Sequence, residues 1–312
     1  MTILNALLTP PPTRNRAPLP ATGRAGRNLP AAIGVSAVLI SGILASLVFE
    51  KKYFVGVVIL AVCGALWELA GAFARKGVAL PLLPLWVGTA GIAVTAWKLG
   101  AEGAFGAYLA TVGACVLWSF VDRAEAEDGT VLEDSPHDVP RTDAHDEARR
   151  SRSVDATASV LAATYLPFLA SFAVLLVAQD HGVAKVITLF ALPIANDTGG
   201  WLAGITFGRR PMAPSVSPKK SWEGFAGSLI AAVGAGAACL FFLDGPLWAG
   251  AALGACCTFV ATLGDLGESL LKRDLGLKDM GTLLPGHGGL MDRLDSILVT
   301  APIVYLFTLI PW

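Results

Sequence analysis

Residues 222–243 read WEGFAGSLIAAVGAGAACLFFL, an apolar stretch with a single charged side chain, Glu223. A helix of this length can cross the hydrocarbon core of a bilayer, which is about 30 Å thick. The rest of the chain has the same character, because 54% of its 312 residues are hydrophobic, only 15% are charged and the mean hydropathy is +0.62. These values exclude an ordinary soluble domain, a disordered chain and a secreted disulfide scaffold. We therefore expect an integral membrane protein.

Similar stretches lie on both sides of this one and predict an all-α polytopic membrane protein with about nine transmembrane helices. The predicted spans are residues 31–49, 53–74, 79–97, 101–120, 154–178, 183–207, 222–243, 246–271 and 294–311. With a cytoplasmic amino terminus, all of the 23 Lys and Arg residues fall on the cytoplasmic side except Lys51, Lys52, Lys98 and Lys185. Loops rich in Lys and Arg stay inside, so this asymmetry places the carboxyl terminus outside.

The same pattern divides the chain into four regions. They are a disordered basic cytoplasmic tail, N-terminal transmembrane helices, a charged cytoplasmic loop and a C-terminal catalytic transmembrane domain, at residues 1–30, 31–120, 121–153 and 154–312. The tail has four Arg and no acid, and the loop has ten Asp or Glu with almost no apolar periodicity. We interpret the loop as a solvated connector. Metal binding by His137 and His145 within it is the alternative.

Charge and cysteine usage exclude other kinds of site. The formal net charge of -1 provides no basic surface for nucleic acid, so no nucleic-acid partner is expected. The five cysteines lie in apolar runs and lack the paired spacing of a zinc site. We interpret them as small packing residues, namely Cys63, Cys115, Cys239, Cys256 and Cys257.

Polar residues inside the predicted spans are the first candidates for a functional site, because burying them in lipid is costly. The span 183–207 contains Asn196 and Asp197, followed by glycines at positions 200, 204 and 208. The glycine stripe alone is typical of helix packing. The segment after it combines cations and hydroxyls that suit phosphate, namely Arg209, Arg210, Ser215, Ser217, Lys219, Lys220 and Ser221. The alternative for these cations is a topology signal with lipid headgroup contacts.

The densest group of polar residues is GDLGESLLKRDLGLKDMGTLLPGHGGLMDRLD, residues 264–295. On helical spacing, one face carries Asp265, Glu268, Ser269 and Lys272, and the next span begins with Asp292, Asp295 and Ser296. The loop between them includes Lys278, Asp279, Pro285, Gly286, His287, Gly288 and Gly289. Carboxylates that meet over a basic, glycine-rich loop favour Mg²⁺-assisted phosphoryl or nucleotidyl transfer. An ion-pair network between the two spans is the alternative.

These residues resemble the signature of phosphatidate cytidylyltransferases, the CDP-diacylglycerol synthases. The matching positions are Ser269, Lys272, Arg273, Lys278, Asp279, Gly281, Pro285, His287, Gly288, Gly289, Asp292, Arg293, Leu294 and Asp295. The resemblance extends upstream through Asp197 and residues 217–224, where Ser221 replaces the more usual Thr, and Trp201 replaces the more usual Tyr. It does not cover the arginine-rich tail or the acidic loop.

The resemblance implies that CTP and phosphatidate react to give CDP-diacylglycerol and pyrophosphate, with Mg²⁺ and a second metal ion as cofactors. It also implies a homodimer in the cell membrane, and Asp265 and Asp292 as metal ligands. We expect an active site on the cytoplasmic side that takes phosphatidate from the inner leaflet among the membrane lipids. The predicted catalytic residues are Asp265, Asp292, Lys272, Lys278, His287 and Arg293. The predicted substrate-binding residues are Asp197, Ser217, Lys219, Lys220, Ser221, Glu268, Ser269, Arg273, Gly288, Gly289 and Asp295.

Two other functions remain open at this point. A CTP-dependent polyprenol or lipid kinase would use similar substrates but transfer the γ-phosphoryl group. An ion-coupled transporter would line an ion path with Asp197, Asp265 and Asp292, and it predicts acids spread along the membrane normal. The crowding of the acids at one predicted membrane surface favours the transferase over the transporter.

Overall fold

The computed structural model describes residues 10–13, 29–130, 141–214, 216–277, 279–281, 283 and 288–311. The elements are α2 (Leu29–Phe49), α3 (Lys51–Ala74), α4 (Leu82–Thr130), α5 (Arg141–Ala163), the π-helix η1 (Thr164–Phe168), α6 (Leu169–Ala178), α7 (Gly182–Phe207), β1 (Pro211–Ala213), β2 (Ser217–Ser221), α8 (Trp222–Phe241), α9 (Leu247–Asp274) and α10 (Met291–Thr308). Each predicted apolar range falls largely on a helix; two of them share α4. The short antiparallel hairpin β1–β2 was not predicted.

The predicted polytopic membrane protein is confirmed by the length and composition of these helices. Within the described residues, five helical stretches are long and apolar enough to cross a bilayer: Lys51–Ala74, Leu82–Ser119, Arg152–Ala178, Trp222–Phe241 and Leu247–Asp274. Many of their large apolar side chains are exposed, including Leu60, Val87 and Ile230. Exposed apolar surface of this kind suits contact with lipid. The total of nine spans and the orientation of the chain remain predictions.

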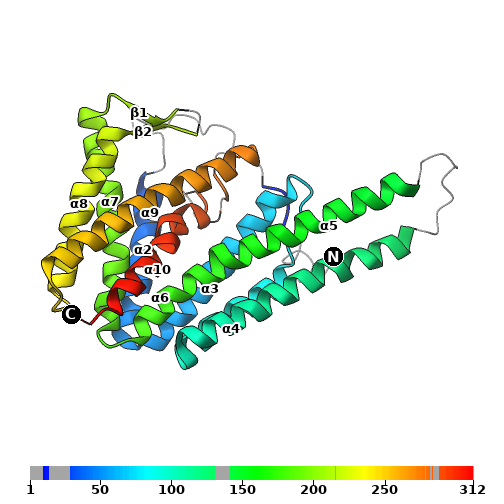
Figure 1. Ribbon diagram of the computed structural model, residues 1–312, viewed down its shortest axis with the longest axis horizontal. Helices are drawn as coiled ribbons and strands as arrows, with labels where there is room; N and C mark the ends of the chain where they lie inside the picture. The colour runs from blue at the N-terminus through cyan, green and yellow to red at the C-terminus, as the bar shows by residue number, and fades with distance from the viewer. Residues whose placement is uncertain are drawn as a thin grey trace.

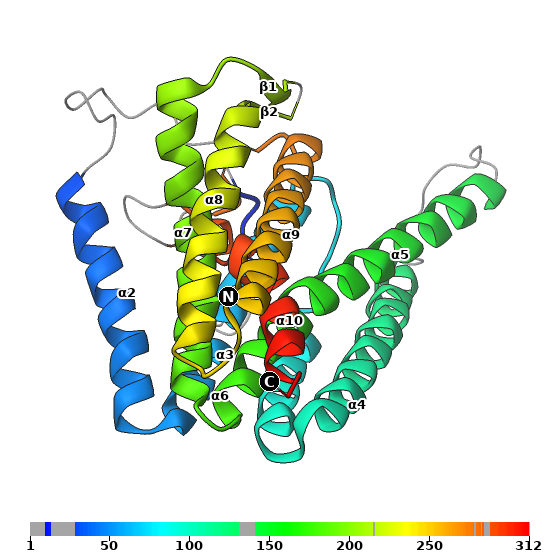
Figure 2. The same ribbon diagram turned by 60° about the vertical axis from the view of Figure 1, so that its left-hand side comes forward.

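The helices run between two ends of an elongated bundle (Figures 1 and 2). One end carries the hairpin, the carboxyl-terminal end of α7, the amino-terminal end of α8 and the carboxyl-terminal end of α9. The turn between α8 and α9 and the carboxyl terminus of the chain lie at the opposite end. Helices α7, α8, α9 and α10 pack on one another in sequence order. The polar segments before α8 and after α9 therefore lie at the same end of the bundle.

Helices α4 and α5 project from the rest of the bundle as an antiparallel pair (Figure 1). Helix α4 is kinked at Gly100, whose φ of 72° is a left-handed conformation that suits glycine. The sequence predicted a charged connector at residues 121–153, but residues 121–130 continue α4 and residues 141–153 belong to α5. The prediction missed these helical ends because it relied on apolar periodicity, whereas Ala, Glu and Arg favour helix without it.

Two kinds of packing hold the helices together. In α3 and α4, large side chains such as Leu66, Leu69 and Leu85 are fully or almost fully buried. Helices α7, α8 and α9 instead approach through glycine. A methyl group on Gly199 would lie 2.6 Å from the carbonyl oxygen of Gly227, and one on Gly254 would overlap the Ala232 carbonyl. The backbones of these three helices are therefore in direct contact.

Residues 10–13 lie against the end of α3, although the sequence predicted a disordered tail over residues 1–30. The Thr13 N–H donates to the Gly71 carbonyl at 2.9 Å, and Arg75 Nη1 donates to the Thr13 carbonyl at 2.6 Å. The prediction rested on the small apolar surface that this segment can bury. Here backbone groups and one arginine supply the contacts. Tail residues 1–9 and 14–28 lie outside the described part of the chain.

Candidate active site

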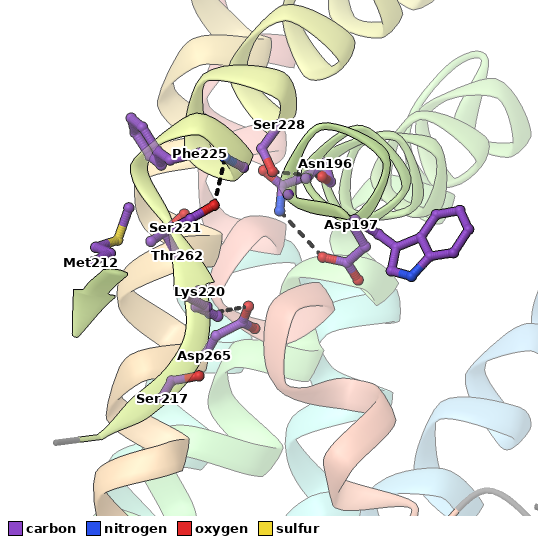
Figure 3. A pocket seen from close by; sticks show the side chains of 14 residues that line it. Asn196, Asp197, Met212, Ser217, Lys220, Ser221, Phe225, Ser228, Thr262 and Asp265 are labelled. Atoms are coloured by element: carbon purple, nitrogen blue, oxygen red, sulfur yellow. Dashed lines mark hydrogen bonds and ion pairs between the residues drawn. The ribbon is translucent and has the colours of Figure 1, made fainter. Parts of the chain in front are cut away.

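A cavity of about 350 Å³ opens between α7, the hairpin, α8 and α9. Figure 3 shows the side chains that line it. Helix α7 provides Asn196 and Asp197, strand β2 provides Ser217 and Lys220, and helix α9 provides Asp265. A pocket of this size, with a few convergent polar groups, is typical of a small-molecule site. Ser221 of β2 also lines the cavity, so the structure brings five predicted site residues from three separate segments together.

Polar side chains at the junction of the hairpin and α8 hold the hairpin on the start of this helix. Ser221 accepts a hydrogen bond from the Gly224 N–H at 3.0 Å and so caps the amino terminus of α8. Glu223, in the first turn, accepts hydrogen bonds from the backbone N–H groups of Arg209 at 3.1 Å and Arg210 at 3.2 Å. The strand that carries Ser217 and Lys220 is therefore held in a defined position at the cavity.

Lys220 and Asp265 form an ion pair at this cavity, with Nζ and Oδ2 separated by 2.7 Å (Figure 3). Both side chains are partly exposed, at 31% and 22%. On the α7 side, the Asn196 carbonyl accepts from Ser228 Oγ at 2.7 Å, and Asn196 Nδ2 donates to Asp197 Oδ1 at 3.3 Å. The cavity therefore presents an ammonium group and two carboxylates, an arrangement that can bind a phosphate together with a cation.

A second group of charges connects α9 with α10 through Lys272. Its ammonium group lies 2.8 Å from Glu268 Oε2 and 3.1 Å from Asp292 Oδ1. Asp292 also accepts hydrogen bonds from the backbone N–H groups of Gly289 at 2.9 Å and Met280 at 3.2 Å. Burial alone would raise the pKa of Asp292, but the Lys272 ammonium and these N–H donors outweigh it and hold that pKa below its usual value. Asp292 is therefore an ionised group at neutral pH.

Buried carboxyl groups beside this centre favour a bound cation. Glu268 and Asp295 are only 5% and 9% exposed and lie within hydrogen-bonding reach of each other. Glu268 Oε1 has no hydrogen-bond donor among the described residues, and neither does the nearby buried hydroxyl of Tyr165. Two adjacent carboxyl groups need a proton or a cation between them. The donor set fits Mg²⁺ chemically, although no group of three or more His, Cys, Asp or Glu with metal-binding geometry occurs among the described residues.

The remaining predicted site residues differ in their exposure, and some of them lie outside the described part of the chain. Arg273 and Arg293 are exposed, Ser269 is partly buried, and Gly288 has a φ of 87° that suits glycine. Lys278, His287 and the side chain of Lys219 lie outside the described residues. Asp295 lies in the second turn of α10, where its Oδ1 accepts from the backbone N–H of Ser296 at 2.7 Å.

Two residues at the site were missed by the sequence reasoning. Glu68 of α3 is 2% exposed and accepts hydrogen bonds from backbone N–H groups at Leu283 and Met291. Tyr165 lies in η1, whose Pro167 cannot donate the backbone hydrogen bond of a regular helix. A buried acid in an apolar span is itself a signal of function. The sequence prediction considered such acids only in the carboxyl-terminal half of the chain, and so it missed Glu68. Tyr165 had no comparable signal.

The fold and the site define a polytopic membrane protein with a polar, charged cavity at one end of its bundle. The sequence pattern of the cytidylyltransferase family matches residues 30–310. The phosphatidate cytidylyltransferase of Mycobacterium leprae is 40% identical over 297 residues, which cover 93% of this chain and 91% of the relative. The Mycobacterium tuberculosis protein of the same name is 39% identical, over 94% of this chain and 87% of its own length.

Similarity to more distant relatives is confined to part of the chain. The phosphatidate cytidylyltransferase of Haemophilus influenzae is 38% identical over 133 residues, which cover 41% of this chain and 46% of that protein. The two mycobacterial relatives match almost the whole length at about 40% identity. This chain therefore belongs to the phosphatidate cytidylyltransferase family.

Proposed function

We infer that this protein transfers the cytidylyl group of CTP to phosphatidate, giving CDP-diacylglycerol and pyrophosphate for phospholipid synthesis. Family membership over nearly the whole chain supports this activity. The structural observation that carries it is the Lys220–Asp265 ion pair at the cavity, next to a second charge centre on Lys272. Such a pair of centres can bind two phosphate-containing substrates and a cation at one membrane surface.

In the proposed reaction a phosphate oxygen of phosphatidate attacks the α-phosphorus of CTP. A new P–O bond forms there as the bond to pyrophosphate breaks, without a covalent enzyme intermediate. The phosphate oxygen is already ionised near neutral pH, so no dedicated general base is required. Lys220, Lys272 and Arg293, with Lys278, would neutralise the charge on the phosphates as the bonds change. His287 would contact a phosphate and can act as an acid.

The binding roles follow the two charge centres. Lys220 can exchange Asp265 for a substrate phosphate, and Ser217 and Ser221 lie beside it at the cavity. Gly288 and Gly289 present backbone near Asp292, where a phosphate could approach closely. We assign the other binding contacts to Asp197, Lys219, Glu268, Ser269, Arg273 and Asp295.

We propose Asp265 and Asp292 as ligands of Mg²⁺ and of a second metal ion. When bound, such an ion would supply positive charge to the phosphates and to the departing pyrophosphate. The carboxyl pair Glu268–Asp295 would complete an oxygen-rich environment around Asp265. In the structure Asp265 contacts Lys220, and Asp292 contacts Lys272, so metal binding would require each lysine to take another partner. Substrate phosphate is the partner that the reaction provides.

We also propose nine transmembrane spans with a cytoplasmic amino terminus, and a homodimer in the cell membrane. The hairpin end of the bundle would then face the cytoplasm, where CTP is available, and phosphatidate would enter sideways from the inner leaflet. Helices α7, α8 and α9 run in alternating directions in Figure 2, as successive crossings of a bilayer require. The distribution of Lys and Arg supports it independently.

The test is an assay of purified protein in detergent with phosphatidate, Mg²⁺ and CTP labelled in the cytidine. We expect label in the lipid product and release of pyrophosphate. Asp265→Asn and Asp292→Asn should each lower kcat by about 10²–10³-fold, the usual effect of removing one group that stabilises the transition state electrostatically. Glu102→Gln, an exposed acid far from the cavity, should keep the wild-type rate.

The other possible results of this assay distinguish a wrong reaction from a wrong metal assignment. Transfer of the γ-phosphoryl group without cytidine would identify a lipid kinase and contradict the proposed reaction. Near-normal turnover by both aspartate variants would reject the metal assignment but not the activity. Activity that persists after complete chelation of divalent ions would do the same.

A further inference from the structure

Glu68 is a buried acid of α3 whose hydrogen bonds reach the site loop and Met291, the first residue of α10. The site loop is the segment between α9 and α10, of which the structure describes residues 275–277, 279–281, 283 and 288–290. The Glu68 carboxylate accepts hydrogen bonds from the backbone N–H groups of Leu283 at 2.9 Å and Met291 at 3.1 Å. The side chain is only 2% exposed, and no Lys or Arg within the described residues forms an ion pair with it. A buried carboxylate held by backbone donors fixes the segments that carry those donors.

Two glycines of the same segment leave the space that Glu68 fills. A methyl group on Gly281 would overlap the Glu68 carboxyl group. One on Gly289 would lie 2.9 Å from Glu68 Oε2 and 2.8 Å from Asp292 Oδ2. Both glycines belong to the family signature, yet neither has a φ in the left-handed region. The structure explains them by the close approach of a carboxylate rather than by backbone conformation.

Asp292 holds the same segment from the side of α10. It accepts the N–H groups of Met280 and Gly289, while Glu68 accepts those of Leu283 and Met291. The four donors alternate between the two carboxylates along the chain. The position of Asp292, and through Lys272 that of Glu268, therefore depends on a residue of the N-terminal half.

We propose that Glu68 is a positioning residue for cytidylyl transfer, which sets the site loop and Asp292 in the geometry needed at the phosphates. This inference rests on the proposed function, because it assigns a role within that reaction. Glu68 acts through the loop and does not itself contact the reacting atoms. A small displacement of a positioned group can lower turnover by about 10²-fold, so the loop geometry should affect kcat strongly.

The experiment compares full-length wild type with Glu68→Gln, Glu68→Asp and Glu50→Gln in the CTP–phosphatidate assay. Glu50 lies just before the opposite end of α3 and is exposed, so Glu50→Gln is the matched control. We expect Glu68→Gln to lower kcat at least about tenfold, with a smaller change in the KM for CTP. The glutamine amide keeps one acceptor oxygen, but its NH₂ group would face a backbone N–H, and two donors cannot form a hydrogen bond. Glu68→Asp should retain more activity than Glu68→Gln.

Amide hydrogen exchange separates positioning from a merely structural role. In Glu68→Gln the peptides covering residues 279–291 should exchange faster, while α8 and the start of α3 keep wild-type protection. A structural role alone would lower the thermal midpoint and leave kcat per folded molecule unchanged. Wild-type kcat together with wild-type exchange of the loop would overturn the proposal, whereas an inactive wild type would count against the proposed function instead.

The conservative Glu68→Asp variant keeps the proposal falsifiable if Glu68→Gln fails to fold, and a double-mutant cycle gives a further test. Gly281→Ala should be strongly damaging in the wild-type background, because its methyl group would overlap the Glu68 carboxyl group. In the Glu68→Ala background the same substitution should cost at most about threefold in kcat/KM, since the space is then available. Equal costs in the two backgrounds would show that Glu68 and the loop are not coupled.

Discussion

The glycines of α2–α4 and those of α7–α9 are used in opposite ways. A methyl group added at Gly42, Gly56 or Gly91 would meet nothing within 4 Å. At Gly199, Gly227, Gly236, Gly250 and Gly254 it would strike the backbone of a neighbouring helix. The N-terminal helices are therefore held by side chains such as Leu85, whereas backbone contacts hold the carboxyl-terminal ones. There are exceptions on both sides: a methyl group on Gly88 or Gly103 would overlap a side chain, whereas one on Gly234 or Gly267 would meet nothing within 4 Å.

Close backbone packing has a direct consequence for the site. It lets α7, the start of α8 and the end of α9 surround one small cavity, with Asp197, Ser221 and Asp265 on separate segments. Side chains interdigitated between these helices would hold the three segments farther apart. The N-terminal half is nevertheless not a passive support, because Glu68 reaches the site loop from α3. Four substitutions test this contrast, beginning with the largest expected effect.

Lys272→Met should have the largest effect, because it removes the ammonium group between Glu268 and Asp292. Breaking a buried ion pair from one side typically costs about 3–5 kcal/mol. We expect a large drop in the thermal midpoint in detergent and no measurable turnover. Lys185→Met is the control, since Lys185 donates to Gln179 at the opposite end of the bundle. Equal stability of the two variants would contradict the role of Lys272.

Leu85→Ala should destabilise the N-terminal half without disabling the site. Leu85 is fully buried, and replacing such a leucine by alanine usually costs about 2–5 kcal/mol. The thermal midpoint should fall, while kcat measured on folded protein at low temperature stays near the wild-type value. Leu83→Ala, at a position that is 44% exposed, provides the comparison and should change little. A selective loss of kcat in Leu85→Ala would mean that the two halves are more tightly coupled than the packing indicates.

Gly254→Ala adds one methyl group where α8 and α9 touch, and it would overlap the Ala232 carbonyl. Overpacking of this kind costs about 1–3 kcal/mol. Because the displaced helices line the cavity, both the thermal midpoint and kcat/KM should fall. Gly91→Ala makes the same chemical change on α4 with nothing within 4 Å and should be nearly neutral. If both variants behave alike, the proposed difference between the halves is wrong.

Arg75→Gln should have the smallest effect, because it removes only the exposed hydrogen bond to the Thr13 carbonyl. The expected loss of stability is below about 1 kcal/mol, with unchanged turnover. Trypsin cleavage after Arg14, next to this contact in sequence, should become faster. Lys76→Gln alters the neighbouring exposed cation and serves as the control. Unchanged cleavage in Arg75→Gln would show that this bond does not hold residues 10–13.

The lengths of the apolar stretches were the basis of most of the fold prediction. The predicted spans fall largely on helices because a backbone in lipid must satisfy its own hydrogen bonds, so hydropathy largely determines secondary structure. The helical ends at residues 121–130 and 141–153 were missed because they are charged, and the hairpin because Pro211–Ala213 and Ser217–Ser221 are too short to show a pattern. Hydropathy also gives no information on which helices touch, and so it could not predict the glycine contacts.

The candidate site was predictable where the residues lie close together in sequence. The face of Asp265, Glu268 and Lys272 followed from helical spacing, and the structure places all three near the end of α9. The pairing of Lys220 with Asp265 joins residues 45 positions apart and could not be read from spacing. Glu68 is more than 200 positions from the backbone groups that it binds. Contacts at that separation depend on helix packing, which a single sequence does not reveal.

The length of the α4–α5 pair has a practical consequence for imaging the protein. At about 1.5 Å per residue, the part of α4 after Gly100 is about 45 Å long, some 15 Å more than the hydrocarbon thickness. A rigid antibody fragment raised against this projecting arm would stand clear of the detergent micelle. It would give electron microscopy a fixed marker for particle alignment and would show on which face of the membrane the arm emerges.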